Sequence, residues 1–267
     1  MEVRYLKTRI ISAFVALLIV VPLVLLGGVF YEVLIAFASL LALKEIYDLK
    51  KSHKSYPNTV KYIGMISLLL IVLSNFKDLT IYNGISYQIL ALTTLFILMP
   101  TVFYKNNEYE MQDAIYLLGI ILFLGLSFNI FLIIRLRNIK IFGFLILIPT
   151  LNDIFAYLIG SKFGKHKMCE KISPHKTWEG SLGGLLVGTI GSIVYYYFLI
   201  GNINLKVIAI TIILSVAGQI GDLVMSKIKR ENEIKDFSNL MPGHGGMLDR
   251  LDSTIFVFMT YMFLMIF

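Results

Sequence analysis

Residues 1–28 read MEVRYLKTRIISAFVALLIVVPLVLLGG, a basic start followed by an apolar run of about 20 residues. A helix of that length can cross the hydrocarbon core of a bilayer. The apolar core of a signal peptide is shorter, roughly 7–15 residues, and is followed by a small-residue cleavage site, which this stretch lacks. The stretch therefore predicts a first transmembrane helix that the protein keeps.

The rest of the chain has the same apolar character. Of its 267 residues, 57% are hydrophobic and only 15% are charged, and the mean hydropathy is +0.79. Soluble domains carry about 25% charged residues, so this composition favours an integral membrane protein. We expect an all-α fold, a polytopic membrane protein with about nine transmembrane helices. Their expected ranges are 10–30, 31–47, 60–76, 79–99, 112–134, 141–161, 181–200, 205–226 and 251–267.

The basic residues indicate an orientation. They outnumber the acidic residues by 24 to 17, which gives a net charge of +7, and loops rich in Lys and Arg usually face the cytoplasm. Nine spans with a cytoplasmic N-terminus place four basic segments there: the N-terminal arm and the connections after the second, sixth and eighth spans. One connection disagrees, because RLRNIKI (residues 135–141), with Arg135, Arg137 and Lys140, would face outward. Either this short loop breaks the rule or one early span is misplaced.

The unusual polar patterns gather in one part of the chain. Residues 1–140 carry most of their charges in connections, and we interpret them as N-terminal transmembrane helices that serve as a scaffold. Residues 141–267 hold nearly all of the polar motifs, and we interpret them as the catalytic transmembrane region with cytoplasmic motif loops.

Two aspartates fall inside expected spans. Asp153 lies in LIPTLNDIFAYLIG and Asp222 in AGQIGDLVMSKIKR. An ionisable side chain in a span costs about 2.5–3.5 kcal/mol on insertion scales. Each aspartate alone is compatible with a structural hydrogen bond between helices. Two of them at similar depth, beside polar loops, favour a shared functional site.

A glycine-rich stretch, MPGHGGMLDRLDS (residues 241–253), precedes the last span. Asp249 and Asp252 are three residues apart, so a helix places both on one face. The glycines of this stretch permit positive φ and can turn backbone N–H groups toward a phosphate. The simpler alternatives are capping of the helix by the aspartates and an ordinary tight turn, which would not need this many glycines.

The four aspartates form a possible ligand set with oxygen donors only: Asp153, Asp222, Asp249 and Asp252. Such donors suit Mg²⁺ or Mn²⁺. For Lys176, inside SPHKTWEG, and for Arg230 we expect phosphate contacts, whereas other loop lysines fit a topology signal. The histidines match no zinc pattern, and the single cysteine, Cys169, excludes an intrachain disulfide.

Residues 226–253, SKIKRENEIKDFSNLMPGHGGMLDRLDS, closely resemble the signature of the phosphatidate cytidylyltransferase (CDP-diacylglycerol synthase) family. Two further blocks are similar to that family: NDIFAYLIGSKFGKHK followed by ISPHKTWEGSLGG, and GQIGDLVMSKIKR. The chain departs from the family pattern at Asn152, Ile154 and Phe237. None of these departures removes a charge, so they bear on fine geometry rather than on activity.

The resemblance implies a Mg²⁺-dependent nucleotidyltransferase that converts CTP and phosphatidate to CDP-diacylglycerol and pyrophosphate for phospholipid biosynthesis. It further implies a second ion such as K⁺ and a homodimer. We also expect residues 1–140 to supply dimer contacts, no nucleic-acid partner, and a multi-pass protein of the cell inner (plasma) membrane. Asp222 and Asp249 match the family's metal ligands, and Asp153 and Asp252 are secondary candidates. We assign phosphate contacts in catalysis to Lys176, Arg230 and Arg250. The further residues expected to bind substrate are Ser173, Ser226, Lys229, Lys235, His244, Gly245 and Gly246.

Other functions remain open at this point. A CTP-dependent lipid kinase would also combine CTP, a lipid and a multi-span core, with an alcohol as its acceptor. Enzymes that use CDP-alcohols resemble D-G-x-x-A-R followed by spaced aspartates, a pattern that this sequence does not contain. A secondary transporter would show pseudo-symmetric halves, whereas here the polar motifs lie in one half.

Overall fold

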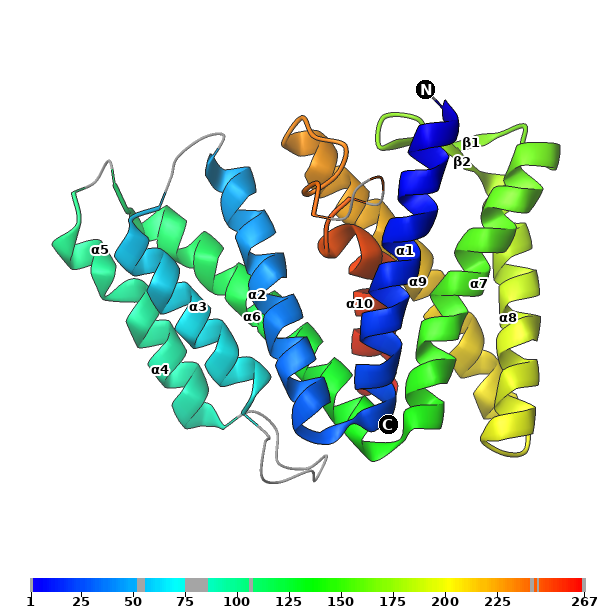
Figure 1. Cartoon of the computed structure of the whole chain (residues 1–267), viewed down its shortest axis with the longest axis horizontal. Coiled ribbons are helices and arrows are strands. Elements are labelled where there is room, and N and C mark those ends of the chain that lie inside the picture. Colours follow the sequence, from blue (N-terminus) through cyan, green and yellow to red (C-terminus); the bar gives the residue numbers. More distant parts are fainter. Residues whose placement is uncertain are drawn as a thin grey trace. The chain divides into compact units, whose positions relative to one another are not determined.

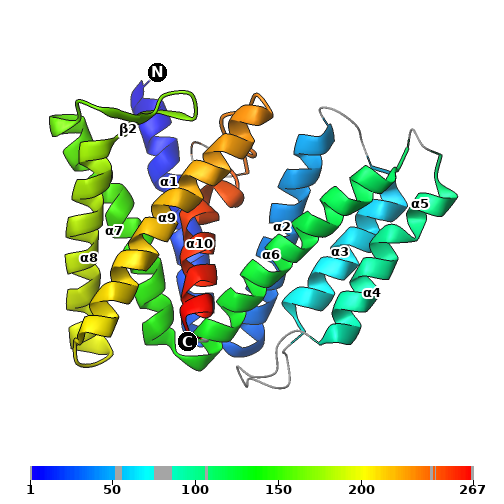
Figure 2. The same cartoon turned by 180° about the vertical axis from the view of Figure 1, so that it is seen from behind.

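The computed structural model describes residues 2–51, 56–74, 86–105, 108–240, 243 and 245–265 (Figures 1 and 2). Its helices are α1 (Glu2–Leu26), α2 (Gly28–Lys51), α3 (Asn58–Val72), α4 (Tyr87–Leu98), α5 (Pro100–Phe103), α6 (Met111–Arg137), α7 (Ile139–Phe163), α8 (Trp178–Leu199), α9 (Leu205–Glu231) and α10 (Leu248–Leu264). Strands β1 (Lys167–Cys169) and β2 (Ser173–Thr177) form an antiparallel hairpin that the sequence did not predict. The expected all-α class is confirmed for the described residues, with this hairpin as a small addition.

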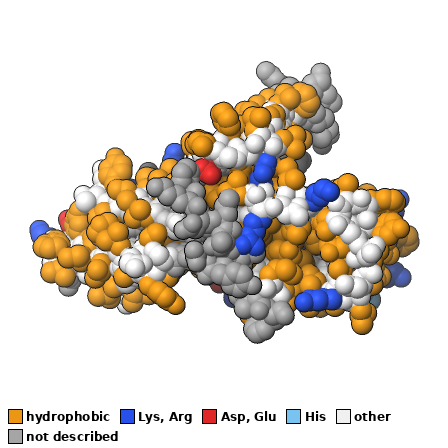
Figure 3. All heavy atoms as spheres, turned by 90° about the horizontal axis from the view of Figure 1, so that it is seen from below, with side chains coloured by type: hydrophobic (Ala, Val, Ile, Leu, Met, Phe, Trp, Pro, Cys, Tyr) orange, Lys and Arg blue, Asp and Glu red, His pale blue; other side chains and the backbone are white. Residues whose placement is uncertain are grey.

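The helices differ in whether their length and apolar composition allow them to cross a membrane. By length and composition, α6, α7, α8 and α9 can cross a bilayer, and these four are the long apolar helices among the described residues. Shorter apolar helices cover Ser12–Leu26, Asn58–Val72 and Tyr87–Phe103. The number of nine spans is therefore not confirmed, and residues 79–85 of the fourth expected span lie outside the described residues. Many hydrophobic side chains are exposed on the face shown in Figure 3, which is seen from below relative to Figure 1.

Most helices differ in their bounds from the expected spans, and two of these differences concern the motifs. Helix α9 continues to Glu231, so the residues Ser226, Lys229 and Arg230 lie on its last turns. Basic side chains are stabilised there by the helix dipole. Helix α10 begins at Leu248, three residues before the expected span, so Asp249 lies in its first turn.

The chain divides into two compact units. The first unit comprises Met1–Arg137 with Phe237–Leu248, and the second comprises Asn138–Asp236 with Asp249–Phe267. In the first unit α6 packs against α2, α3 and α4, and α1 packs against α2. Most of the glycine-rich stretch thus belongs to the first unit, and the chain passes into the second unit inside the first turn of α10.

Arg135 of the first unit has a structural partner that accounts for its position. Its Nε donates to the Val24 carbonyl oxygen at 2.6 Å and its Nη2 donates to the Leu25 carbonyl oxygen at 2.9 Å. These carbonyls lie in the last turn of α1, where a cation is favoured by the helix dipole. A Cβ on Gly27, which has φ +70°, would lie 2.7 Å from the guanidinium. The Arg135 charge that conflicts with the topology rule therefore caps α1.

We expect Arg135→Ala to lower the stability of the protein, because the last carbonyls of α1 lose two hydrogen bonds to a cation. The expected loss is about 1 kcal/mol. It is measurable as a lower thermal unfolding midpoint in detergent. Lys140→Ala is the control, since the Lys140 side chain is exposed. An equal effect of both substitutions would contradict the capping role.

In the second unit α7 and α8 pack closely along glycines of α8. A Cβ on Gly184 would lie 2.6 Å from the carbonyl oxygen of Asn152, and a Cβ on Gly188 would lie 2.1 Å from the Asn152 side-chain oxygen. Small residues of this kind let membrane helices approach each other. The Asn152 side chain also donates to the Ser215 hydroxyl on α9 at 2.8 Å. Asn152, a departure from the family pattern, thus ties α7 to α9 while contacting α8.

Candidate active site

The second unit contains an ion pair between the β2 strand and α9. The Lys176 ammonium group pairs with Oδ2 of Asp222, and the Ser226 hydroxyl donates to Oδ1 of the same carboxylate at 3.2 Å. Asp222 and Ser226 are four residues apart on α9, so they share one face of the helix. The hairpin brings Lys176 to that face. Three residues predicted for the site are therefore in direct contact.

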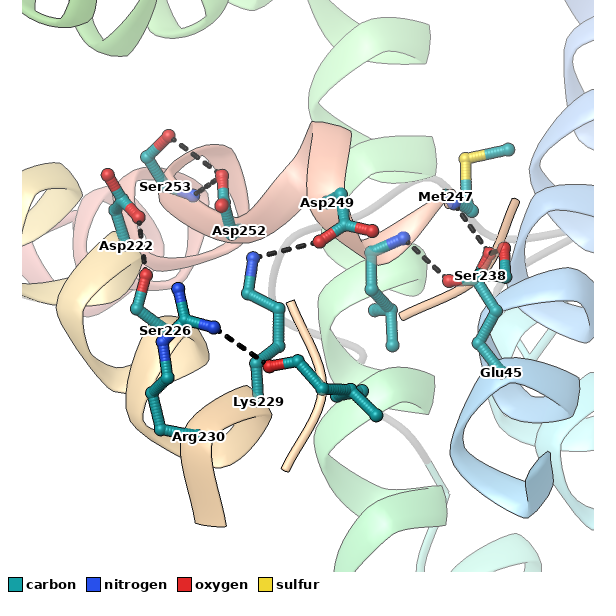
Figure 4. A network of polar contacts seen from close by, with 12 residues as sticks. Glu45, Asp222, Ser226, Lys229, Arg230, Ser238, Met247, Asp249, Asp252 and Ser253 are labelled. Carbon is teal, nitrogen blue, oxygen red and sulfur yellow. Dashed lines mark hydrogen bonds and ion pairs between the residues drawn. The ribbon is translucent and has the colours of Figure 1, made fainter. Parts of the chain in front are cut away.

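A second ion pair joins α9 to α10. Lys229 donates from Nζ to Oδ1 of Asp249 at 2.8 Å (Figure 4). The two side chains are only 10% and 4% exposed. A buried ion pair of this kind depends on both partners, because removal of one leaves an uncompensated charge away from water. Lys229, expected to bind substrate, thus contacts the carboxylate of Asp249.

Asp153 and Asp252 bring two more carboxylates toward Asp222. Asp153, on α7, and Asp252, on α10, each interact electrostatically with Asp222 and with Lys176. The Ser253 amide and hydroxyl donate to Oδ1 of Asp252 at 2.8 Å and 3.3 Å. Helices α7, α9 and α10 therefore bring three acidic side chains close to one lysine, Lys176.

A pocket of about 240 Å³ opens beside this group. Its polar wall contains Asp153, Lys176 and Asp222, whereas other parts of its lining are apolar or aromatic. The further lining residues are Ala156, Tyr157, Met168, His175, Thr177, Ser181 and Gln219. Gln219 and Ser181 exchange two hydrogen bonds across α9 and α8. Sequence reasoning did not select Gln219, although its position three residues before Asp222 places it on the same helix face.

Two predicted phosphate ligands are arranged differently from Lys176. The Arg230 guanidinium donates to the carbonyl oxygens of Ile172 at 3.2 Å and Ile234 at 3.0 Å, so it braces the hairpin and the segment after α9. Arg250 is exposed on the first turn of α10. Neither residue is part of the pocket lining. Their phosphate contacts stay predictions.

The remaining predicted substrate residues lie in several environments. Ser173 begins β2, opposite Cys169, and Lys235 is exposed after α9. Gly245 adopts φ +77°, as a glycine permits. Gly246 lies against the carboxyl group of Glu45, because a Cβ at this position would be 2.2 Å from Oε1 of that residue. His244 lies outside the described residues.

Three of the predicted metal ligands, Asp153, Asp222 and Asp252, approach Lys176, and the fourth, Asp249, pairs with Lys229. Among the described residues, no group of three or more His, Cys, Asp or Glu side chains is arranged to hold a metal ion. Asp222 and Asp249 are each paired with a lysine. Their oxygen donors nevertheless have the chemistry that Mg²⁺ requires, and a lysine ammonium neutralises a carboxylate as a metal cation would. The metal assignment stays a prediction.

Comparison with known proteins adds a finding that covers nearly the whole chain. Residues 7–267 match the cytidylyltransferase family. The chain is similar to the phosphatidate cytidylyltransferase of Staphylococcus aureus, with 34% identity over 94% of this chain and 95% of the relative. It is similar at 34% and 35% identity, over the same shares, to the proteins of that name from Staphylococcus haemolyticus and Staphylococcus epidermidis.

Proposed function

The chain belongs to the cytidylyltransferase family, and we propose from this that it transfers CMP from CTP to phosphatidate, forming CDP-diacylglycerol and pyrophosphate. The observation that supports this most strongly is the similarity along 94% of the chain to relatives named phosphatidate cytidylyltransferase. The pocket beside the Lys176–Asp222 pair supplies a place for the reaction.

The proposed reaction needs charge compensation more than proton transfer. A phosphate oxygen of phosphatidate attacks the α-phosphorus of CTP. The bond from that phosphorus to the oxygen bridging to the β-phosphorus breaks, and pyrophosphate leaves with the electron pair. The nucleophile is already anionic at neutral pH, so the main obstacle is to bring two polyanions together. Fixed cations and correct positioning lower such a barrier.

Lys176 is the described cation best placed for this role. Its ammonium group lies in the pocket wall, oriented by Asp222, which in turn accepts a hydrogen bond from Ser226. An oriented cation needs little rearrangement when phosphate charge arrives. Ala156, Tyr157 and Met168 also line the pocket and offer apolar contact for the glycerol and acyl part of a lipid. The lining therefore offers both kinds of contact that phosphatidate requires.

The metal part of the proposal concerns the aspartates. Asp222 and Asp249 would hold Mg²⁺, with Asp153 and Asp252 as further ligands and a second ion such as K⁺ beside it. When bound, Mg²⁺ draws negative charge from the triphosphate and from the leaving pyrophosphate. Lys176 pairs with Asp222 and Lys229 pairs with Asp249, so each proposed primary ligand has a lysine beside it.

We also propose where the protein is located and how it assembles. The motif segments would face the cytoplasm, where CTP is found, in a protein of the cell inner membrane. The acyl chains of phosphatidate would remain in the bilayer, while its headgroup reaches a polar cavity between the helices. Polar, non-helical backbone is tolerated at membrane depth only where it lines such a cavity. We further propose a homodimer.

Labelled CTP tests the reaction directly. The purified protein in detergent is incubated with phosphatidate, Mg²⁺ and CTP that carries its label on either the α- or the γ-phosphate. We expect the α-label in the lipid and the γ-label in pyrophosphate, in equal amounts. A lipid kinase would place the γ-label in the lipid and would prefer an alcohol such as diacylglycerol. Lipid labelled from the γ-phosphate, or no labelled lipid at all, would refute the proposal.

A further inference from the structure

Glu45, on α2 of the first unit, is a buried acidic residue outside the predicted site. Its residue exposure is only 4%. Its Oε1 accepts hydrogen bonds from the Ser238 hydroxyl at 2.7 Å and from the Met247 amide at 2.7 Å, and its Oε2 accepts from the Leu248 amide at 2.9 Å (Figure 4). One carboxyl group therefore holds three donors, all from residues 238–248.

One of these donors, the Leu248 amide, is the first amide of α10, and the Met247 amide is the one immediately before it. The initial amides of a helix have no partner within the helix and are normally satisfied by a capping side chain. Met247, which precedes the first residue of α10, has no side-chain oxygen to do this. Glu45 performs the capping instead, from about 200 residues away in sequence. An acidic group also suits the positive end of the helix dipole.

The glycine-rich stretch is shaped to admit Glu45. A Cβ on Gly246 would lie 2.2 Å from Oε1 of Glu45 and 2.6 Å from the Ser238 hydroxyl oxygen. Both distances are far shorter than a carbon–oxygen contact allows, so a larger residue at position 246 would displace the Glu45 or Ser238 side chain. The sequence suggested that these glycines admit a phosphate, and at Gly246 the group that approaches is the carboxyl of Glu45.

We propose that Glu45 is a positioning residue for the CMP-transfer reaction, acting through the start of α10. Leu248 immediately precedes Asp249, and successive helical residues are about 100° apart around the axis. Holding the Leu248 amide therefore fixes the direction in which Asp249 leaves the helix, and that of Asp252 on the same face. Among the described residues, the hydrogen-bond donors to Glu45 are Ser238, Met247 and Leu248, none of which is a predicted metal ligand or phosphate-binding cation. The inference rests on the proposed function, which supplies the reaction that the positioning serves.

The test compares Glu45→Gln with Glu32→Gln, the same substitution on the same helix at another buried carboxyl, which is 9% exposed. Gln keeps the shape of Glu but has one accepting oxygen and one donating NH₂ group, so it cannot accept all three hydrogen bonds. We expect hydrogen exchange of the Met247 and Leu248 amides to become faster in Glu45→Gln. We also expect kcat to fall about tenfold or more, with a higher Mg²⁺ concentration for half-maximal rate. Glu32→Gln should match the unmodified protein in all three measurements.

Ser238→Ala provides a milder variant that removes only one donor. It should shift the same measurements in the same direction by a smaller factor, about two- to threefold. The double variant should lose little more than Glu45→Gln alone, because both changes act on one network.

Several results would overturn the inference. Unchanged exchange in Glu45→Gln would show that Glu45 does not hold α10. Faster exchange with unchanged kcat and Mg²⁺ dependence would show a brace that the reaction does not need. Equal losses in Glu32→Gln would show a general effect of the substitution. If the proposed function is wrong, the unmodified protein itself transfers no CMP. The hydrogen-exchange measurement still reports whether Glu45 caps α10, so the two failures can be told apart.

Discussion

Asp222→Asn is expected to reduce kcat for CMP transfer by about 10²-fold or more, with little loss of stability. Losing one preorganised electrostatic group commonly has this effect on a rate. Asparagine has the shape of aspartate and can still accept from the Ser226 hydroxyl, but it no longer pairs with the Lys176 ammonium group. The substitution also removes negative charge from the group of aspartates predicted to hold Mg²⁺. Initial rates at saturating CTP and phosphatidate measure the effect.

The matched control for this prediction is Asp113→Asn. Asp113 is a buried aspartate on α6 of the first unit, and it accepts from the Glu110 amide at 3.1 Å. An amide oxygen can also accept that hydrogen bond, so this variant should keep full activity. Ser226→Ala should lie between the two, since it removes one hydrogen bond from Asp222 and leaves its charge. Wild-type rates in Asp222→Asn would show that the Lys176–Asp222 pair serves only the fold.

Breaking the Lys229–Asp249 pair from either side should both destabilise the protein and abolish activity. The side chains are 10% and 4% exposed, so either single substitution leaves a charge in a poorly hydrated place. Removing one partner of a buried pair typically costs about 3–5 kcal/mol. We therefore expect lower unfolding midpoints for both Asp249→Asn and Lys229→Met in detergent, together with loss of CMP transfer.

The double variant separates the structural effect from the catalytic one. Lys229→Met combined with Asp249→Asn leaves neither charge without its partner, so most of the lost stability should return. Activity should not return, because Asp249 is a proposed metal ligand. Recovery of activity together with stability would contradict a chemical role for Asp249. Failure to recover stability would show that the two residues depend on other partners as well.

Local features of this protein were predictable from the sequence. The long apolar helices follow from runs of apolar residues, because a helix satisfies its backbone hydrogen bonds within its own segment and can therefore lie in lipid. The resemblance of residues 226–253 to a known signature identified the family, which the comparisons bear out. The spacing of Asp249 and Asp252 predicted that a helix would place both on one face, and both lie on α10. The β1–β2 hairpin was not predicted, because its strands are short and carry no clear alternation of apolar and polar residues.

The choice of partner for each charged group was decided only by the tertiary structure. Sequence alone could not show that Lys229 pairs with Asp249, that Arg135 caps α1, or that Glu45 caps α10. The physical reason is that helical periodicity reports which residues share a face but not which face of another helix lies against it. A buried charge or an uncapped helix end must find a partner, and its identity depends on how segments distant in sequence pack together.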